Sequence, residues 1–254
     1  MEVLASRLTW RRLPWPVEVV SIGIGYAFYA IVRVLAPHRV NVSYDHASQV
    51  RQVEQSFGIY HELTLNQFIT GRTWLEVGAS YYYASLHFII TPLLLAWLWK
   101  RRQRAYAPLR SAIVIATAGA LVVYATWPLA PPRYAMAGAV DTVIDHPVAW
   151  ASGHGVEGFV NDLAAMPSLH VGWAVWCAVA VTAVFHSRWR YLAWLYPLGT
   201  TLVVVATANH YVLDAVGGAF VVGLPMYLCG LRLTRTLVSH PASEQPRVAE
   251  ACAA

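Results

Sequence analysis

Three short segments of this sequence place residues suited to catalysis at the ends of long apolar runs: APPRYAMAG at 130–138, AAMPSLHVGWA at 164–174 and TANHYVLDAVGG at 207–218. In the last segment His210 and Asp214 are four residues apart, so they share one face of a helix. A carboxylate that accepts from one imidazole nitrogen fixes the tautomer and leaves the other nitrogen free as a nucleophile or base. Because an unpaired carboxylate in an apolar run is costly, we expect Asp214 to pair with His210. A structural His–Asp pair that braces the fold is the alternative.

The middle segment predicts an anion site at the start of a helix. Pro167 ends the preceding loop, Ser168 is suited to be the N-cap, and His170 falls in the first turn. The free N–H groups and the positive dipole end of a helix N-terminus favour a phosphate. The alternative is that Ser168 only caps the helix and that His170 faces lipid headgroups.

Arg133 is the candidate phosphate clamp in the first segment. It is the only arginine of the loop 130–167 and follows Pro131 and Pro132, which stiffen its approach. A guanidinium binds phosphate oxygens through two parallel hydrogen bonds. Binding of lipid headgroups without catalysis is the alternative. Weaker candidates for the same pocket are His154, Asn209, Tyr211 and Tyr134.

A metal centre built from His154, His170, His210 and Asp214 is a further alternative. Their spacing fits no familiar ligand motif, so we expect neither a metal nor another cofactor.

The composition predicts an all-α, polytopic membrane protein. Of the 254 residues, 57% are hydrophobic and 12% are charged, about half the roughly 25% charged residues of a soluble domain. A membrane crossing needs about 20 apolar residues, and about six candidate spans are present, at 17–36, 77–99, 110–130, 168–186, 191–209 and 211–231. The first is too long for a typical signal peptide and is expected to stay uncleaved. The membrane domain is thus 17–235.

The segments outside the spans have distinct expected roles. Residues 1–16 form a cytoplasmic N-terminal segment, and 236–254 a disordered cytoplasmic tail. Residues 41–73 are expected as short interfacial helices, and 130–167 as an ordered outer loop rich in Pro and Gly.

The distribution of basic residues predicts that both termini are cytoplasmic. Of the 18 Lys and Arg residues, thirteen fall in the inner segments, four in the outer segments, and Arg33 lies within the first span. All three candidate segments then lie at outer helix ends. The net charge of +5 comes from residues flanking apolar runs, which favours membrane lipids as partners and excludes a nucleic-acid surface.

The pattern PPRY…MPSLH…NHYVLD resembles the three signature motifs of the type-2 phosphatidic acid phosphatase superfamily, over roughly residues 40–231. It is most similar to the branch that includes inositol phosphorylceramide synthase-like lipid phosphotransferases. The resemblance implies a six-helix membrane bundle with an extracytoplasmic site. It also implies that His210 is a nucleophile forming phospho-histidine, that Asp214 orients it, and that His170 protonates the leaving oxygen. Ser168 and Arg133 would hold the phosphate, without a metal.

Two positions depart from the phosphatase pattern. Thr126 stands where the family has a lysine seven residues before Arg133, and Val204 where it has an arginine six residues before His210. The phosphotransferase branch also lacks the second of these. Losing two cations removes charge stabilisation from a metal-free site.

The sequence therefore predicts a metal-independent lipid phosphatase or phosphotransferase of a bacterial plasma membrane, acting on a lipid phosphate with water or a polyol alcohol as acceptor. The alternatives are a non-catalytic transporter or lipid-binding scaffold of the same fold, or altered chemistry such as diphosphate elimination.

Overall fold

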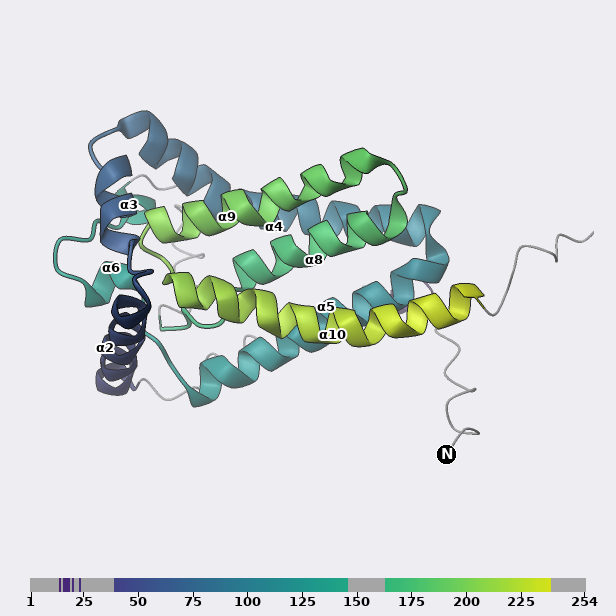
Figure 1. The fold of residues 1–254 in the computed structure, drawn as a ribbon, viewed down its shortest axis with the longest axis horizontal. Coiled ribbons are helices and arrows are strands. Elements are labelled where there is room, and N and C mark those ends of the chain that lie inside the picture. Colours follow the sequence, from purple (N-terminus) through teal and green to yellow (C-terminus); the bar gives the residue numbers. More distant parts are fainter. Residues whose placement is uncertain are drawn as a thin grey trace, which may run out of the picture.

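The computed structural model describes residues 39–145 and 163–238, together with Pro14, 16–18, Val20 and Gly23. Within these residues the chain forms helices and loops, with one isolated β-bridge between Leu129 and Ala164 and no strand. Figure 1 shows the longer helices side by side in a bundle: α4 (Thr73–Arg101), α5 (Gln103–Thr126), α8 (Leu169–Val184), α9 (Leu195–Ala206) and α10 (Val212–Val238). The expected all-α class is confirmed.

The bundle helices follow the apolar runs of the sequence. The predicted spans 77–99, 168–186 and 211–231 correspond to α4, α8 and α10, and the span 110–130 corresponds to α5, which already ends at Thr126. The span 191–209 is divided between a 3-10 helix, η2 (Arg188–Trp194), and α9. The span 17–36 lies largely outside the described residues. Among the described helices, α4 and α5 are long and apolar enough to cross a membrane, and 169–184 and 212–228 are shorter apolar helices.

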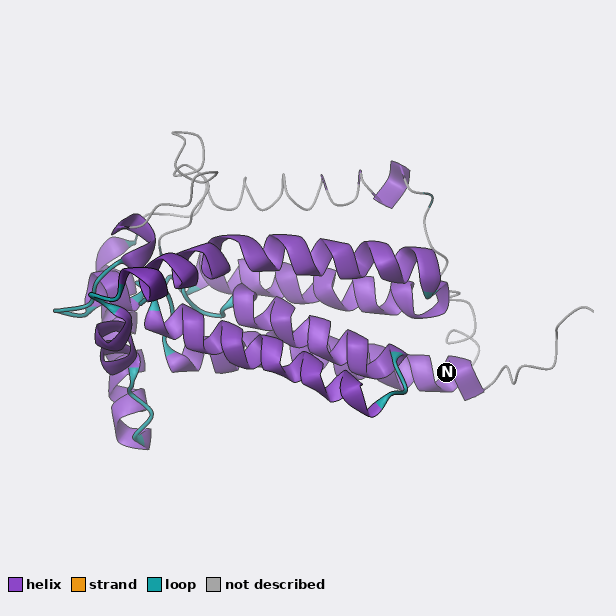
Figure 2. Cartoon of the chain, turned by 90° about the horizontal axis from the view of Figure 1, so that it is seen from above, coloured by secondary structure: helices purple, strands orange, loops and turns teal. Residues whose placement is uncertain are grey.

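Two helices lie across one end of this bundle. They are α2 (Val40–Phe57) and α3 (Glu62–Ile69), and α2 runs roughly perpendicular to the bundle axis in both views (Figures 1 and 2). Gly58 adopts the left-handed conformation, with φ of 68°, and ends α2. The segment 41–73 therefore contains helices, of which α2 is longer than expected, and its position at a membrane interface stays a prediction.

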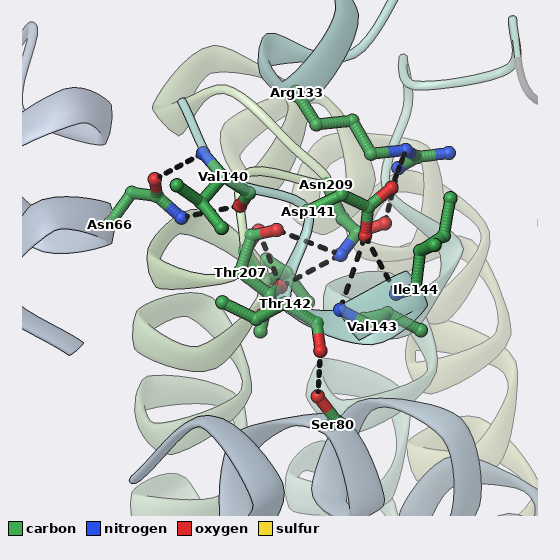
Figure 3. Close-up of polar contacts among 11 residues, drawn as sticks. Asn66, Ser80, Arg133, Val140, Asp141, Thr142, Val143, Ile144, Thr207 and Asn209 are labelled. Carbon is green, nitrogen blue, oxygen red and sulfur yellow. Dashed lines mark hydrogen bonds and ion pairs between the residues drawn. The ribbon is translucent and has the colours of Figure 1, made fainter. Parts of the chain in front are cut away.

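The first part of the loop after α5, residues 127–145, is held by side-chain contacts with α3 and α4. It contains α6 (Pro132–Ala135) and α7 (Thr142–Asp145). Asn66 of α3 binds both backbone groups of Val140, and Ser80 of α4 donates to the carbonyl of Thr142 at 2.8 Å (Figure 3). The rest of the loop, with His154, lies outside the described residues.

Helices α8 and α10 cross in backbone contact. A Cβ atom on Gly218 would lie 2.1 Å from the carbonyl oxygen of Ser168, and one on Gly172 would lie 3.0 Å from the carbonyl oxygen of Gly218. At Gly218 only glycine allows this approach, and at Gly172 a Cβ would be a tight contact. Gly218 thus permits the close packing of the two helices, whereas a Cβ on Gly217 would make ordinary contacts. The crossing brings the first turns of the two helices together.

The two ends of the bundle differ in charge. The connection from α4 to α5 carries Lys100, Arg101, Arg102 and Arg104, and lies at the end opposite to α2, α3 and α6 (Figure 1). The three candidate segments lie at the α2–α3 end.

Helix α10 continues to Val238, three residues into the expected disordered tail 236–254. The remainder of that tail lies outside the described residues.

Candidate active site

Backbone hydrogen bonds join the candidate segments to one another. The N–H of Ala165 donates to the carbonyl of Leu129 at 3.3 Å, beside the β-bridge. The N–H of Ser168 donates to the carbonyl of Asp214 at 2.9 Å. The three segments are far apart in the sequence and form one continuous structure at the end of the bundle.

His210 lies in a tight turn between α9 and α10. Ala208 has a positive φ of 55°, which a non-glycine residue adopts only at some cost. The N–H groups of Asn209 and His210 both donate to the carbonyl of Val204, each at 3.1 Å. These bonds close the turn and hold the His210 side chain at the start of α10.

The tautomer of His210 is set by a backbone carbonyl. Its Nδ1 atom lies 2.8 Å from the carbonyl oxygen of Ala165 and 3.4 Å from Oδ2 of Asp214. A carbonyl only accepts, so Nδ1 carries the hydrogen and Nε2 keeps its lone pair. The expected His210–Asp214 pair is present, but Ala165 is the closer acceptor. Oδ2 of Asp214 also accepts from the N–H of Tyr211 at 2.8 Å.

His170 faces His210 from the first turn of α8. The ring centroids are 5.7 Å apart and the rings are inclined by 61°. Ser168 is the N-cap of α8, as expected, and its Oγ accepts from the N–H of Val171 at 3.5 Å. The two imidazoles therefore come from different helices and meet where α8 and α10 begin.

Two residues of α4 that the sequence did not single out for the site also contact His170. Tyr83 stacks on the ring with centroids 4.3 Å apart, and His87 meets its edge at 4.2 Å. They are four residues apart, hence on one helix face. A histidine inside an apolar run with a tyrosine one turn earlier is the signal that could have identified them.

A small cavity lies beside His170, with a volume of about 10 Å³, room for about one water molecule. Val204 lines it, so the position of the family's arginine is here an apolar wall. Within the described residues, one buried atom at this cavity lacks a hydrogen-bond partner, Oη of Tyr196. The cavity is otherwise lined by Tyr82, Tyr83, Leu86, His87 and Thr200.

Arg133 contacts the turn that carries His210. Its backbone N–H donates to the carbonyl of Ala208 at 2.9 Å, and its guanidinium donates to Oδ1 of Asn209 (Figure 3). Its Nε lies 3.0 Å from a carboxylate oxygen of Asp141. The guanidinium also lies over the ring of Tyr134, 4.6 Å from the centroid. Arg133 is thus held from several sides against the turn that precedes His210.

The charges around Arg133 oppose the effect of burial. Burial alone would lower the pKa of Arg133, but the phenol of Tyr83 and the carboxylate of Asp141 outweigh it and raise that pKa. Burial raises the pKa of Asp141, while Arg133 opposes the rise. Asp141 is a partner that the sequence did not reveal, because it lies eight residues from Arg133 in an irregular loop.

The remaining candidates have different positions. Asn209 lies between Arg133 and Thr207, whose carbonyl and hydroxyl both accept from its amide. Tyr211 is buried in an apolar cluster with Ala47 and Val50 of α2. Thr126 is exposed at the end of α5, with its hydroxyl bonded to the carbonyl of Val122 at 2.8 Å.

Comparison with known proteins assigns this arrangement to a family. The family model described as the PAP2 superfamily matches residues 48–228, more than two thirds of the 254 residues. Searches of curated proteins and of solved structures found no match. The matched stretch contains all three candidate segments, α3 and the C-terminal part of α2, and the chain belongs to the PAP2 superfamily.

Proposed function

We propose that the chain is a membrane-embedded, metal-independent lipid phosphatase or phosphotransferase that works through phospho-histidine at His210. Membership of the PAP2 superfamily suggests phosphatase-type activity. The observation that carries the proposal is the His170–His210 pair, with centroids 5.7 Å apart and the Nδ1 hydrogen of His210 engaged by Ala165. One imidazole is prepared as a nucleophile and the other faces it as an acid.

The first half-reaction forms a P–N bond. Nε2 of His210 attacks the phosphorus, the P–O bond to the lipid breaks, and His170 gives its proton to the departing oxygen. The phospho-imidazole ring carries a positive charge, which the nearby Asp214 carboxylate stabilises.

The second half-reaction reverses the roles. Water or an alcohol attacks the phosphorus, His170 takes the proton of this acceptor, and the P–N bond breaks with its electron pair returning to His210. Water yields inorganic phosphate, and a polyol alcohol yields a new phosphate ester.

Arg133 and the N-terminus of α8 are suited to hold the phosphate. The guanidinium is oriented by Asn209 and Asp141, and a cation near the developing charge lowers the barrier of such a transfer. The N–H groups at the start of α8, after Ser168, supply a second positive region.

The proposed topology has about six spans, both termini in the cytosol and the site at the extracytoplasmic face of a bacterial plasma membrane. It is supported by the basic α4–α5 connection at the bundle end opposite to the site. Helices α2 and α3 would then lie along the outer interface, and a lipid phosphate would reach the site from the bilayer.

Transfer to an alcohol, as in the inositol phosphorylceramide synthase-like branch, is the finer form of this proposal. Val204 supports it, since that branch also lacks an arginine at this position, and here the side chain is buried beside His170.

The test is a panel of phosphatidic acid, a polyprenyl diphosphate and a phosphoinositide, each with labelled water or inositol as acceptor. Wild type should turn over at least one, with or without a chelator. His210→Ala should lower turnover by at least about 10³-fold, while His186→Ala, exposed near η2, should leave it unchanged. Turnover that survives in His210→Ala would refute the proposal.

A further inference from the structure

Two buried glutamates, one from each of the helices α2 and α3 that lie across the end of the bundle, accept hydrogen bonds from the first turn of α10. Oε1 of Glu62 in α3 accepts from the N–H of Val212 at 2.9 Å. Oε1 of Glu54 in α2 accepts from the N–H of Leu213 at 2.8 Å. These N–H groups have no partner within the helix, because they belong to its first turn. The glutamates therefore cap the helix that begins two residues after His210.

The two glutamates cannot both be satisfied as carboxylates. Both are fully buried, and the second oxygen of each has no hydrogen-bond donor among the described residues. A carboxylate only accepts, whereas a protonated carboxyl also donates. One proton between them supplies the missing donor. In agreement, burial and then the hydrogen bond to Glu62 raise the pKa of Glu54 to about 9.

The surrounding charges favour this single proton. Asp214 on α10 faces Glu54, and its Oδ1 also lacks a partner among the described residues. Tyr60 and Tyr211 are the titratable neighbours, and Arg51 of α2 is the nearby cation. Two ionised glutamates next to Asp214 would place three negative charges around one helix turn.

We propose that Glu54 and Glu62 are positioning residues that share one proton and anchor the first turn of α10, and with it His210, to α2 and α3. An effect of these glutamates on catalysis rests on the proposed function. The sharing of one proton and the anchoring of α10 to α2 and α3 do not. Neither glutamate touches the reacting atoms. They act through the N–H groups of Val212 and Leu213.

The shared proton makes a signed prediction for stability against pH. The ordinary pKa of a glutamate is 4.5 and that of folded Glu54 is about 9. Between these values the folded protein holds a proton that the unfolded chain has released, so stability falls as the pH rises through this window. Above about pH 9 the loss is complete.

The first experiment measures Tm between pH 6 and pH 9 in detergent. In Glu54→Gln the amide oxygen accepts from Leu213 and the amide nitrogen donates to Glu62, so no shared proton is needed. Wild type should lose about 10 °C more than Glu54→Gln over this range, and Glu62→Gln should match Glu54→Gln. Glu76→Gln is the control, because Glu76 is a buried carboxylate that accepts from the N–H of Gly71, away from α10, and it should keep the wild-type profile. Equal pH dependence in wild type and both Gln variants would overturn the proposal, as would failure of both to fold.

The second experiment tests the anchor by hydrogen–deuterium exchange at pH 7. Glu54→Ala and Glu62→Ala should raise exchange in the peptide over residues 209–214 at least about threefold, and the Gln variants should not. With dioctanoyl phosphatidic acid as probe, the Ala variants should lower kcat more than they change KM. Unchanged exchange in the Ala variants would refute the claim that the two glutamates anchor the first turn of α10. Turnover that does not depend on His210 would instead refute the proposed function, and the Tm and exchange results would still decide this inference.

Discussion

The carbonyl oxygen of Ala165 lies 2.8 Å from Nδ1 of His210 and joins the segment before α8 to the turn before α10. This one hydrogen bond has two consequences. It sets which nitrogen of His210 keeps a lone pair, and it couples the position of that nitrogen to the helix that carries His170. The closest partner of His210 is thus a backbone atom, and Asp214 is second, at 3.4 Å.

Asp214→Asn should lower kcat without abolishing it. Ala165 still holds the tautomer, but the ring loses the negative charge that stabilises its cationic phosphorylated form. The loss should be about 2 kcal/mol in the activation free energy, roughly 30-fold in kcat. Steady-state kinetics beside His210→Ala would measure this. If Asp214→Asn were as inactive as His210→Ala, Asp214 rather than Ala165 would set the tautomer.

Arg133 variants should separate charge from geometry. Arg133→Ala should lower kcat/KM about 100-fold, since a charge-assisted contact contributes up to about 3 kcal/mol. Arg133→Lys should retain part of the activity, because lysine keeps the charge but not the planar fork held by Asn209 and Asp141. Arg72→Ala is the matched control, because Arg72 is exposed and lies at the same end of the helix bundle, between α3 and α4. If Arg72→Ala and Arg133→Ala lowered kcat/KM equally, the proposed role of Arg133 in holding the phosphate would be refuted.

Gly218→Ala should destabilise the protein and reduce activity together. The new Cβ would lie 2.1 Å from the carbonyl oxygen of Ser168, so α8 and α10 must separate. We expect a cost of about 2–3 kcal/mol, measured by thermal unfolding, and a larger loss of kcat than of substrate affinity. Gly223→Ala is the control on the same helix, where a Cβ meets nothing within 4 Å. A wild-type Tm for Gly218→Ala would contradict the close crossing.

Much of the bundle could be predicted because long apolar runs bounded by polar residues determine helices. The division of 191–209 into η2 and α9 was missed, because this run was interpreted as one apolar helix, whereas η2 carries two arginines and is less apolar than α9. In the site, His170, His210, Asp214 and Arg133 were recognisable from their types and spacing.

Other parts of the site carry no signal in the sequence. The Ala165 carbonyl is a backbone atom, which residue identity does not reveal. Glu54 and Glu62 lie in amphipathic helices, where a glutamate ordinarily faces water, and only the fold shows that both are buried. Tyr83 and His87 had a usable signal in their four-residue spacing.

The proposed topology predicts which positions a membrane-impermeant maleimide can label in intact cells. In a background with Cys177, Cys229 and Cys252 replaced, Ser56→Cys on exposed α2 should react from outside. Arg188→Cys, at the opposite end of the bundle, should react only after the membrane is permeabilised. The reverse pattern would place the site in the cytosol.

Trapping the intermediate tests the central claim most directly. Wild-type protein mixed with a lipid phosphate that it turns over, quenched in alkali and mapped by mass spectrometry, should carry a phosphoryl group on His210, lost on acid treatment. His210→Ala should carry none, and His186→Ala should match wild type. Turnover with phosphate on another residue, or with no phosphorylated residue at all, would contradict the account.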